Sequence, residues 1–342
     1  MKTRSIKKTG SGKKFVMTGK KVLVTGGLGM IGSTLAHKLI KLGAQVTIVD
    51  ALIEHYGGNL FNIKDIYNRI QLNISDIRDR EAMKYLVQEQ DIIFNLAGQV
   101  CHNDSIEDPF KDTDINYIGH LNVLECLRRY NPKAHIFHAG SRLQFGMIND
   151  TPVNEEHPQN PRSPYALNKN AAENMYLFYY NVHQIPCTLF RIANPFGPRS
   201  QMKHSKYSIV NWFIRQAIED KVIKVFGDGL QIRDYIYVED LCDAFIKAAQ
   251  TETCIGQAFN IGSGTGTSFI EMVKTVVEIV GAGKIESIPW PETYINVETG
   301  DYVTDITKIQ NYTQWTPSVS FREGIIKTCQ FYKLYKNHYW NA

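Results

Sequence analysis

A tyrosine and a lysine four residues apart form the pattern with the clearest chemical meaning in this chain, Tyr165 and Lys169 in Tyr-Ala-Leu-Asn-Lys. A spacing of four places both side chains on one face of a helix. A free phenol, with a pKa near 10, is a poor base at neutral pH, but a nearby ammonium favours the phenolate. The pair therefore predicts a general base that takes a proton from a substrate hydroxyl. A surface pair without function is the alternative for these two residues taken alone.

A serine, Ser141, follows a short apolar segment at 134–138. If that segment is a strand of a parallel sheet, the serine lies near its carboxyl end, where such sheets bind ligands. We expect its hydroxyl to donate to the same substrate oxygen from which Tyr165 takes a proton. The alternative is a serine that only forms a turn at the end of a strand.

Glycines at positions 26, 29 and 32 lie between an expected strand at 21–25 and an expected helix at 31–42. Such glycines let the chain turn tightly and approach a pyrophosphate, which then faces the N-terminus of the helix. Asp50 ends the next expected strand, where a carboxylate hydrogen-bonds a ribose 2′-hydroxyl and repels a 2′-phosphate. The pattern predicts a site for NAD rather than NADP, with a plain strand–helix turn as the alternative.

Short β-branched segments that alternate with helical ones would position these residues. Further strands are expected at 45–50, 70–74, 91–96, 134–138 and 187–191, with a long helix at 166–183. This alternation is typical of an α/β fold with a Rossmann-type, doubly wound parallel sheet. We expect a basic flexible tail at 1–19, an NAD-binding Rossmann domain with the catalytic residues at 20–194, and a smaller, interleaved α/β substrate lobe at 195–342.

Composition places the chain among soluble globular proteins. Its 342 residues are 43% hydrophobic and 21% charged, which excludes a disordered chain, a collagen-like fibre and a small disulfide scaffold. The net charge of +4 comes from eight basic residues within 1–21, and without them the chain carries −4, so no nucleic-acid-binding face is expected. No apolar segment reaches the roughly 18 residues that a membrane helix needs. The six cysteines lack metal-binding spacing and are expected to be reduced, which favours a cytoplasmic protein without a metal site.

These features together resemble the extended short-chain dehydrogenase/reductases of the NAD-dependent epimerase/dehydratase family, which act on nucleotide sugars and include UDP-glucose 4-epimerase. The resemblance covers about residues 20–335. It rests on the glycine turn, Ser141, the Tyr165/Lys169 pair and five further motifs, Ser75-Asp76-Ile77-Arg78, Asn95-Leu96-Ala97-Gly98, Arg191-Ile192-Ala193-Asn194-Pro195-Phe196-Gly197, Gly227-Asp228-Gly229 and Arg233-Asp234-Tyr235.

The resemblance implies which residues bind the two ligands. NAD would contact Gly26, Gly29, Met30, Ile31, Asp50, Asp76, Ile77, Leu96, Ala97, Gly98, Asn116, Tyr165, Lys169 and Ile192. The nucleotide-diphosphate sugar would contact Ser141, Asn194, Val225, Phe226, Arg233 and Asp301. Four of these have structural alternatives: Asn116 could cap a helix, Val225-Phe226 could belong to the core, and Arg233 could pair with Asp228 or Asp234.

The first step implied by the resemblance is oxidation of the sugar, most simply at C4, with Ser141, Tyr165 and Lys169 as catalytic residues. Relatives that are 4,6-dehydratases carry an Asp-Glu pair where this chain has Arg142-Leu143. The prediction is therefore a nucleotide-sugar epimerase. A C4-dehydrogenase, a 4,6-dehydratase and a non-catalytic nucleotide-binding protein are the alternatives. Cys101-His102 would point apart in an extended segment, so we interpret them as a packing cysteine and a surface histidine.

Two further features bear on the substrate and on assembly. Many UDP-sugar relatives have an arginine two places before the Gly-Asp at 300–301, where this chain has Glu298. The nucleotide base therefore stays open, and the basic segment 199–206 could either replace that arginine or be a solvated loop. The helix from Ala166 is apolar on more than one side, and the resemblance suggests a homodimer built from it and from a helix near 115–129.

Overall fold

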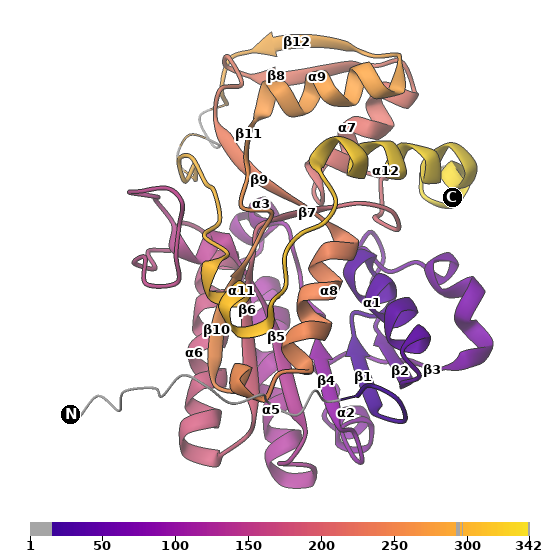
Figure 1. Cartoon of the computed structure of the whole chain (residues 1–342), viewed down its shortest axis with the longest axis vertical. Helices are drawn as coiled ribbons and strands as arrows, with labels where there is room; N and C mark the ends of the chain where they lie inside the picture. Colours follow the sequence, from indigo (N-terminus) through magenta and orange to yellow (C-terminus); the bar gives the residue numbers. More distant parts are fainter. Residues whose placement is uncertain (1–15, 292–294, 296, 341–342) are drawn as a thin grey trace.

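A parallel sheet of seven strands organises the larger half of the chain in the computed structural model, which describes residues 16–291, 295 and 297–340 (Figure 1). The strand order is β10-β6-β5-β4-β1-β2-β3, and every pair is parallel. The strands are β1 (Lys21–Thr25), β2 (Gln45–Asp50), β3 (Ile70–Ile74), β4 (Ile92–Asn95), β5 (His135–Ser141), β6 (Cys187–Ile192) and β10 (Gln257–Ile261).

The sequence of the strands suits a sheet that is covered on both faces. Every residue of β4 and β6 is buried, as expected for continuous apolar strands between two layers of helices. The direction in which strands are added reverses between β1 and β4, and ligands of such sheets bind beside the carboxyl ends at this point. The predicted doubly wound sheet is therefore confirmed.

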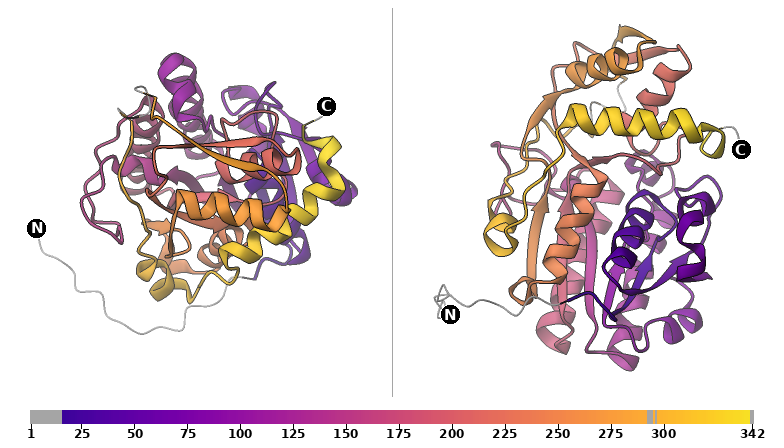
Figure 2. Two further views of the ribbon diagram at one scale, coloured as in Figure 1. Left: turned by 90° about the horizontal axis from the view of Figure 1, so that it is seen from above. Right: turned by 45° about the vertical axis from the view of Figure 1, so that its right-hand side comes forward.

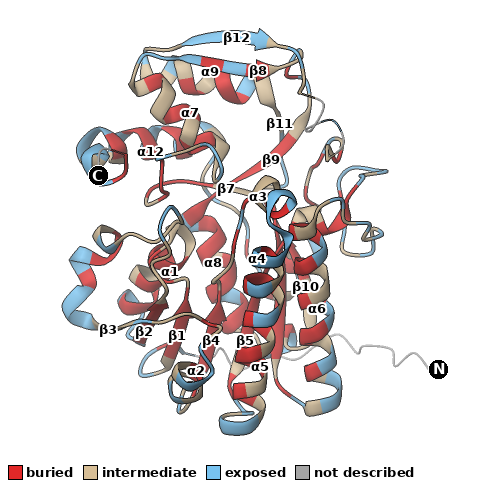
Figure 3. Ribbon diagram, turned by 180° about the vertical axis from the view of Figure 1, so that it is seen from behind, coloured by how far each residue is buried: buried red, intermediate tan, exposed pale blue. Residues whose placement is uncertain are grey.

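Helices cover the two faces and make three layers. One face packs against α1 (Met30–Lys41) and α8 (Val238–Ala249), and the other against α2 (Arg80–Leu86), α5 (Gly119–Tyr130) and α6 (Pro164–His183). Figure 3 shows that α5 and α6 lie side by side, with exposed residues on their outer surfaces. Each face thus has its own apolar core.

A smaller lobe lies beyond the carboxyl ends of the strands (Figures 1 and 2). Its strands are β7 (Asn194–Phe196), β8 (Val222–Phe226), β9 (Ile232–Tyr237), β11 (Gly266–Ser268) and β12 (Lys284–Ile288), and its helices are α7 (Ile209–Ile218), α9 (Phe269–Val280) and α12 (Phe321–Tyr335). Between these elements the chain returns to the larger half as α8 and β10, and later as α11 (Thr307–Thr313), which packs on α8. The division at residue 194 stays a prediction.

Two segments differ from the expectations. Residues 16–19 are held against the larger half, since Met17 is buried in the core and the Gly19 N–H donates to the Gly43 carbonyl at 2.8 Å. The rest of the expected tail, 1–15, lies outside the described residues. The helix expected at 115–129 begins as a π-helical turn at Asp114–Ile118, after the short helices α3 (His102–Glu107) and α4 (Pro109–Thr113). None of the helices described is long and apolar enough to cross a membrane.

Candidate active site

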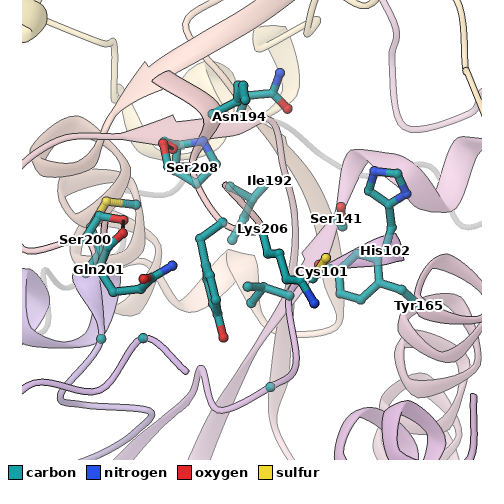
Figure 4. A pocket seen from close by; sticks show the side chains of 18 of the residues that line it. Cys101, His102, Ser141, Tyr165, Ile192, Asn194, Ser200, Gln201, Lys206 and Ser208 are labelled. Carbon is teal, nitrogen blue, oxygen red and sulfur yellow. Dashed lines mark hydrogen bonds between the residues drawn. The ribbon is translucent and has the colours of Figure 1, made fainter. Parts of the chain in front are cut away.

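A cavity of about 890 Å³ lies between the carboxyl ends of the central strands and the smaller lobe. Residues of both halves line it, so that neither half forms the site alone. Figure 4 shows one group of side chains on one side of the cavity, a second group across from it, and Lys206 between them. The first group is Cys101, His102, Ser141 and Tyr165, and the second is Ser200, Gln201 and Ser208.

The glycine turn forms one wall of the cavity. Gly26 has a φ of +65°, and a Cβ at this position would meet the backbone of Ala97 at 2.9 Å, so the turn needs glycine on both counts. Helix α1 then begins at Met30, with Gly29 as an N-cap that has no capping side chain. The first N–H groups of α1 therefore remain available to an anion, and the wall fits a pyrophosphate.

Asp50 lies at the end of β2 and faces the same cavity. Its two carboxylate oxygens accept backbone N–H bonds from Leu28 and Leu52, each at 3.0 Å. Burial raises the pKa of this carboxyl group above its usual value, while those two bonds oppose the shift. The two bonds fix the carboxylate in place, and each oxygen keeps a second lone pair for a ribose hydroxyl.

Tyr165 and Ser141 meet at the centre of the cavity. Tyr165 lies in the first turn of α6, and its backbone N–H donates to Ser105 Oγ at 3.0 Å. Ser141 is the last residue of β5, its hydroxyl accepts the Leu143 N–H at 3.2 Å, and hydrogen bonding by Ser141 opposes the rise in the pKa of Tyr165. Lys169, one turn further along α6, donates from Nζ to the Ala139 carbonyl at 3.0 Å. The three predicted catalytic residues therefore share one site.

The protonation of this group differs from the simple expectation. Burial raises the pKa of Tyr165 to about 12, against the opposing effect of the Ser141 hydrogen bond. Burial also lowers the pKa of Lys169 to about 8, and its Nζ lies 6.0 Å from the centre of the Tyr165 ring. In the ligand-free protein Lys169 therefore does not make the phenol acidic. A further positive charge in the cavity is needed to favour the phenolate.

A buried chain of polar side chains holds the end of β5. The Ser141 N–H donates to Gln144 Oε1 at 2.8 Å, and Gln144 Nε2 donates to Glu173 Oε2 at 2.8 Å. Glu173 in turn pairs with Arg191 of β6 at 2.6 Å, and both side chains are less than 10% exposed. This chain connects β5, α6 and β6 directly behind Ser141 and Tyr165.

Charged side chains gather where the sheet meets the smaller lobe. Arg233 Nη2 pairs with Glu298 Oε1 at 2.5 Å, and not with Asp228 or Asp234. Arg142 faces the same part of the cavity, and burial followed by the charge of Arg233 lowers its pKa to about 10. Arg142 is therefore still protonated at neutral pH.

Aromatic rings line the far end of the cavity in the smaller lobe. Phe226 and Trp290 have ring centres 5.5 Å apart at an interplanar angle of 46°, and both face the cavity. Stacking on such rings is a common way to hold a nucleotide base. Phe226 was expected here from the sequence, whereas no motif pointed to Trp290.

The structure brings the predicted ligand contacts to this cavity with three exceptions. Asn116 lies beneath it, where its amide donates to Asp112 Oδ2 at 2.9 Å and to the Gln99 carbonyl at 3.0 Å. Val225 is fully buried in the core of the smaller lobe, because on β8 it points away from the face that Phe226 presents. Asp301 is exposed, and its carboxylate accepts the Ile232 N–H at 2.7 Å. We therefore no longer count these three as contact residues.

The interpretation of Cys101 and His102 was wrong for the histidine. Cys101 caps the N-terminus of α3 and His102 is its first residue, so the alternation of an extended segment does not apply, and both line the cavity. Burial and then the charge of Arg142 lower the pKa of His102, which is therefore mostly uncharged at neutral pH. Sequence reasoning missed that a helix begins at His102, three residues after Gln99.

The basic segment 199–206 contributes only in part. Lys206 lines the cavity, but its ammonium pairs with Asp104 at 2.7 Å. The guanidinium of Arg199 lies over the ring of Phe331 at 5.9 Å, outside the cavity lining. Neither residue therefore replaces the arginine whose place Glu298 takes.

Comparisons with known proteins agree with this geometry. The family model described as GDP-mannose 4,6 dehydratase matches residues 23–328. A UDP-glucose 4-epimerase of Mycolicibacterium smegmatis is 31% identical over 317 residues, which cover 92% of this chain and 98% of that protein.

Solved structures show the same architecture. The UDP-glucose 4-epimerase of Thermotoga maritima with UDP-glucose has a TM-score of 0.85 at 28% identity and covers 92% of this chain and 99% of its own. The dTDP-glucose 4,6-dehydratase of Bacillus anthracis in complex with NAD has a TM-score of 0.82 at 27% identity, with coverages of 94% and 99%. Epimerases and dehydratases are thus both among the relatives.

Proposed function

This chain belongs to the GDP-mannose 4,6-dehydratase family of extended short-chain dehydrogenase/reductases, and from that premise we propose that it is an NAD-dependent nucleotide-sugar epimerase. The observation that carries the proposal is the joint position of Ser141, Tyr165 and Lys169 in one cavity with the glycine turn. The residues that follow Ser141 are Arg142 and Leu143, so the pair of carboxylates expected of a 4,6-dehydratase is missing from this place.

The glycine turn, Asp50 and Lys169 are the residues that would hold NAD. The turn would receive the pyrophosphate, and Asp50 would accept from the hydroxyls of one ribose, which would also disfavour a 2′-phosphate. Lys169 lies close enough to Tyr165 to hold the other ribose. NAD would supply the hydride acceptor and the positive charge that Tyr165 needs. The relatives with solved NAD complexes support this assignment.

In the proposed reaction Tyr165 takes the proton of the sugar C4 hydroxyl while Ser141 donates to the same oxygen. The keto sugar then turns over in the cavity, and Tyr165 returns the proton as the opposite face of C4 is reduced. Asn194, Phe226 and Arg233 would hold the nucleotide diphosphate during this turn, since all three line the cavity. The product has the mass of the substrate.

The test is incubation of the purified, NAD-loaded protein with UDP-, GDP-, CDP- and dTDP-glucose, followed by chromatography and mass spectrometry. We expect one base series to give an isomer of unchanged mass without a net rise in absorbance at 340 nm. Loss of water would identify a dehydratase instead, and a stoichiometric rise at 340 nm would identify a C4-dehydrogenase.

Tyr165→Phe separates an enzyme from a protein that only binds nucleotides. The variant should lose about 10²- to 10⁴-fold in turnover, because the proton acceptor is removed, and should keep its bound NAD. A wild-type protein that holds NAD but converts no nucleotide-linked sugar, neutral or acidic, would select the non-catalytic alternative.

A further inference from the structure

Arg142 is held rigidly at the edge of the cavity, one residue after Ser141. Its Nε donates to Asn194 Oδ1 at 2.8 Å, and its Nη1 donates to Thr299 Oγ1 at 3.2 Å. The guanidinium also lies over the ring of Tyr302, at 5.3 Å from its centre. Residues from β7 and from the segment after β12 thus orient a side chain that begins at the end of β5. Such positioning indicates a role for the guanidinium itself.

This cation has no anionic partner in the part of the chain that the structure describes. Glu298 is an acidic group whose charge acts on Arg142, but it is bound to Arg233 and no ion pair joins it to Arg142. The other groups that interact with the charge of Arg142 include Arg233, His102 and three tyrosines (Tyr165, Tyr235 and Tyr302), none of them an anion at neutral pH. Among residues 16–291, 295 and 297–340, no protein group accepts a hydrogen bond from its Nη2.

A partly buried guanidinium without a counter-charge is unfavourable unless a ligand supplies the missing anion. A neutral sugar hydroxyl would be served equally well by a neutral side chain such as asparagine. A guanidinium suits an oxyanion, to which it can donate two charge-assisted hydrogen bonds. The unmatched charge of Arg142 therefore points to an anionic group on the substrate.

Building on the function proposed above, we propose that Arg142 binds a carboxylate on the sugar, so that the substrate is a nucleoside diphosphate-linked sugar acid. The carboxyl group would lie near the carbon that Ser141 and Tyr165 address, because Arg142 lines the same cavity as both residues. The other source of an oxyanion is the diphosphate of the nucleotide. We favour the sugar as the source of the oxyanion, because Arg233 on β9 would bind the diphosphate. Arg233 lies in the lobe that carries the aromatic rings Phe226 and Trp290.

The test compares three ligands that share one nucleotide base, with the protein carrying NAD. Thermal unfolding with UDP, GDP, CDP and dTDP first selects the base that stabilises the protein most. Calorimetric titration then measures Kd for the nucleoside diphosphate, for its glucose conjugate, and for the glucuronate conjugate made by oxidising C6 of that glucose. We expect the glucuronate conjugate to bind about 10- to 100-fold more tightly than the glucose conjugate.

Variants assign that preference to Arg142. Arg142→Met should remove it while leaving the affinity for the nucleoside diphosphate alone nearly unchanged, and Arg142→Lys should keep part of it. Thr299→Val keeps the charge but removes one bond that orients it, and should reduce the preference by an intermediate factor. Arg322→Met, on the exposed surface of α12, is the matched control and should change none of the three affinities.

Three results would overturn the inference. Equal affinity of the wild type for the glucose and glucuronate conjugates would show that the protein does not recognise the carboxylate. Equal weakening of all three ligands in Arg142→Met would assign the arginine to the diphosphate. A glucuronate preference that persists in Arg142→Met, in a protein whose unfolding temperature is unchanged, would place the recognition elsewhere.

Failure of the proposed reaction is recognised separately. Because binding does not require the proton acceptor, Tyr165→Phe should keep the glucuronate preference although its turnover is lost. A wild type that shows the preference but converts no sugar would leave the inference standing and overturn the epimerase. A protein that holds NAD and binds none of the nucleotide sugars would overturn both.

Discussion

Tyr165 is the group whose protonation decides whether the proposed reaction can begin. Tyr165 lines the same cavity as the glycine turn and Ser141, but its burial there disfavours the phenolate. Lys169 is buried beside it, and burial lowers its own pKa to about 8, which leaves the ammonium form predominant at neutral pH but less favoured than usual. The phenolate of Tyr165 is therefore favoured only when a ligand adds positive charge to the cavity.

We predict that Tyr165 stays protonated up to about pH 10 in NAD-free protein, because the folded-state pKa lies above the usual value near 10. Bound NAD should lower the pKa, since its positive ring stabilises the anion. The measurement is ultraviolet absorbance of the phenolate, taken as wild type minus Tyr165→Phe, with and without NAD. A Tyr165 signal near pH 8 in the NAD-free protein would contradict this account.

Glu298 is a second side chain with an unusual position, since its carboxylate is bound to the guanidinium of Arg233, the residue expected to contact the diphosphate. At 2.5 Å from Arg233 Nη2, it must be displaced or share its partner when an anionic nucleotide arrives. The carboxylate also accepts N–H bonds from Thr299 and Gly300, at 3.0 and 3.1 Å, which fix it in this place.

Glu298→Gln should increase the affinity for the nucleoside diphosphate roughly tenfold, because the amide keeps the shape but no longer competes as an anion. Calorimetric titration of wild type and variant with the same nucleotide measures this. Weaker binding by the variant would mean that Glu298 positions Arg233 for the ligand instead of competing with it.

The elements behind the site are joined by the buried pair of Glu173 and Arg191. These residues fix the spacing of α6 and β6, and through Gln144 they hold the last residue of β5. The same arrangement therefore contributes to the fold and positions Ser141 against Tyr165.

Glu173→Gln should destabilise the protein by about 3–5 kcal/mol, because Arg191 would keep a buried charge without its partner. Denaturant unfolding measures this value, and a lower turnover of the folded variant would report the loss of positioning. The matched control is Glu125→Gln on α5, whose ion pairs with Arg128 and Arg129 are partly exposed and should be worth less than about 1 kcal/mol. Equal losses of unfolding free energy in the two variants would show that the buried ion pair contributes no more to stability than the partly exposed ones.

At the scale of the whole molecule, the outer surface formed by α5 and α6 carries large apolar residues. Leu167, Phe178 and Val182 of α6 are 58%, 51% and 57% exposed and recur at helical spacing, and Ile118, directly before α5, is 41% exposed. Apolar side chains in such a row usually mark a surface that another protein covers. The homodimer expected from the sequence would use this surface and stays a prediction.

Phe178→Asp combined with Val182→Asp should convert that dimer into a monomer, because two carboxylates would be buried in the interface. Light scattering at micromolar protein concentration measures the mass of both forms. Leu334→Asp on α12, which is 76% exposed away from this surface, is the control and should not change the mass. A wild type that is already monomeric would contradict the prediction.

Local patterns were sufficient to predict six of the seven strands of the larger half, whereas no strand was expected at β10 (Gln257–Ile261). Strands β1, β2 and β3 begin and end at the expected residues, because β-branched segments bounded by turns depend mainly on neighbouring residues. The glycine turn, Asp50, Ser141 and the Tyr165/Lys169 pair belong to the same category. Each lies at a fixed place in a strand–turn–helix unit, so finding the unit also locates the residue.

Contacts between distant parts of the chain could be decided only by the tertiary structure. The partner of Arg233 is Glu298, 65 residues away, rather than either neighbouring aspartate. His102 faces the cavity only because a helix starts at that residue, and Arg142 is oriented by Asn194 and Thr299 from the smaller lobe. The burial that shifts the pKa of Tyr165 likewise comes from packing of the whole site. Such charges and contacts depend on three-dimensional distance, which short sequence patterns do not encode.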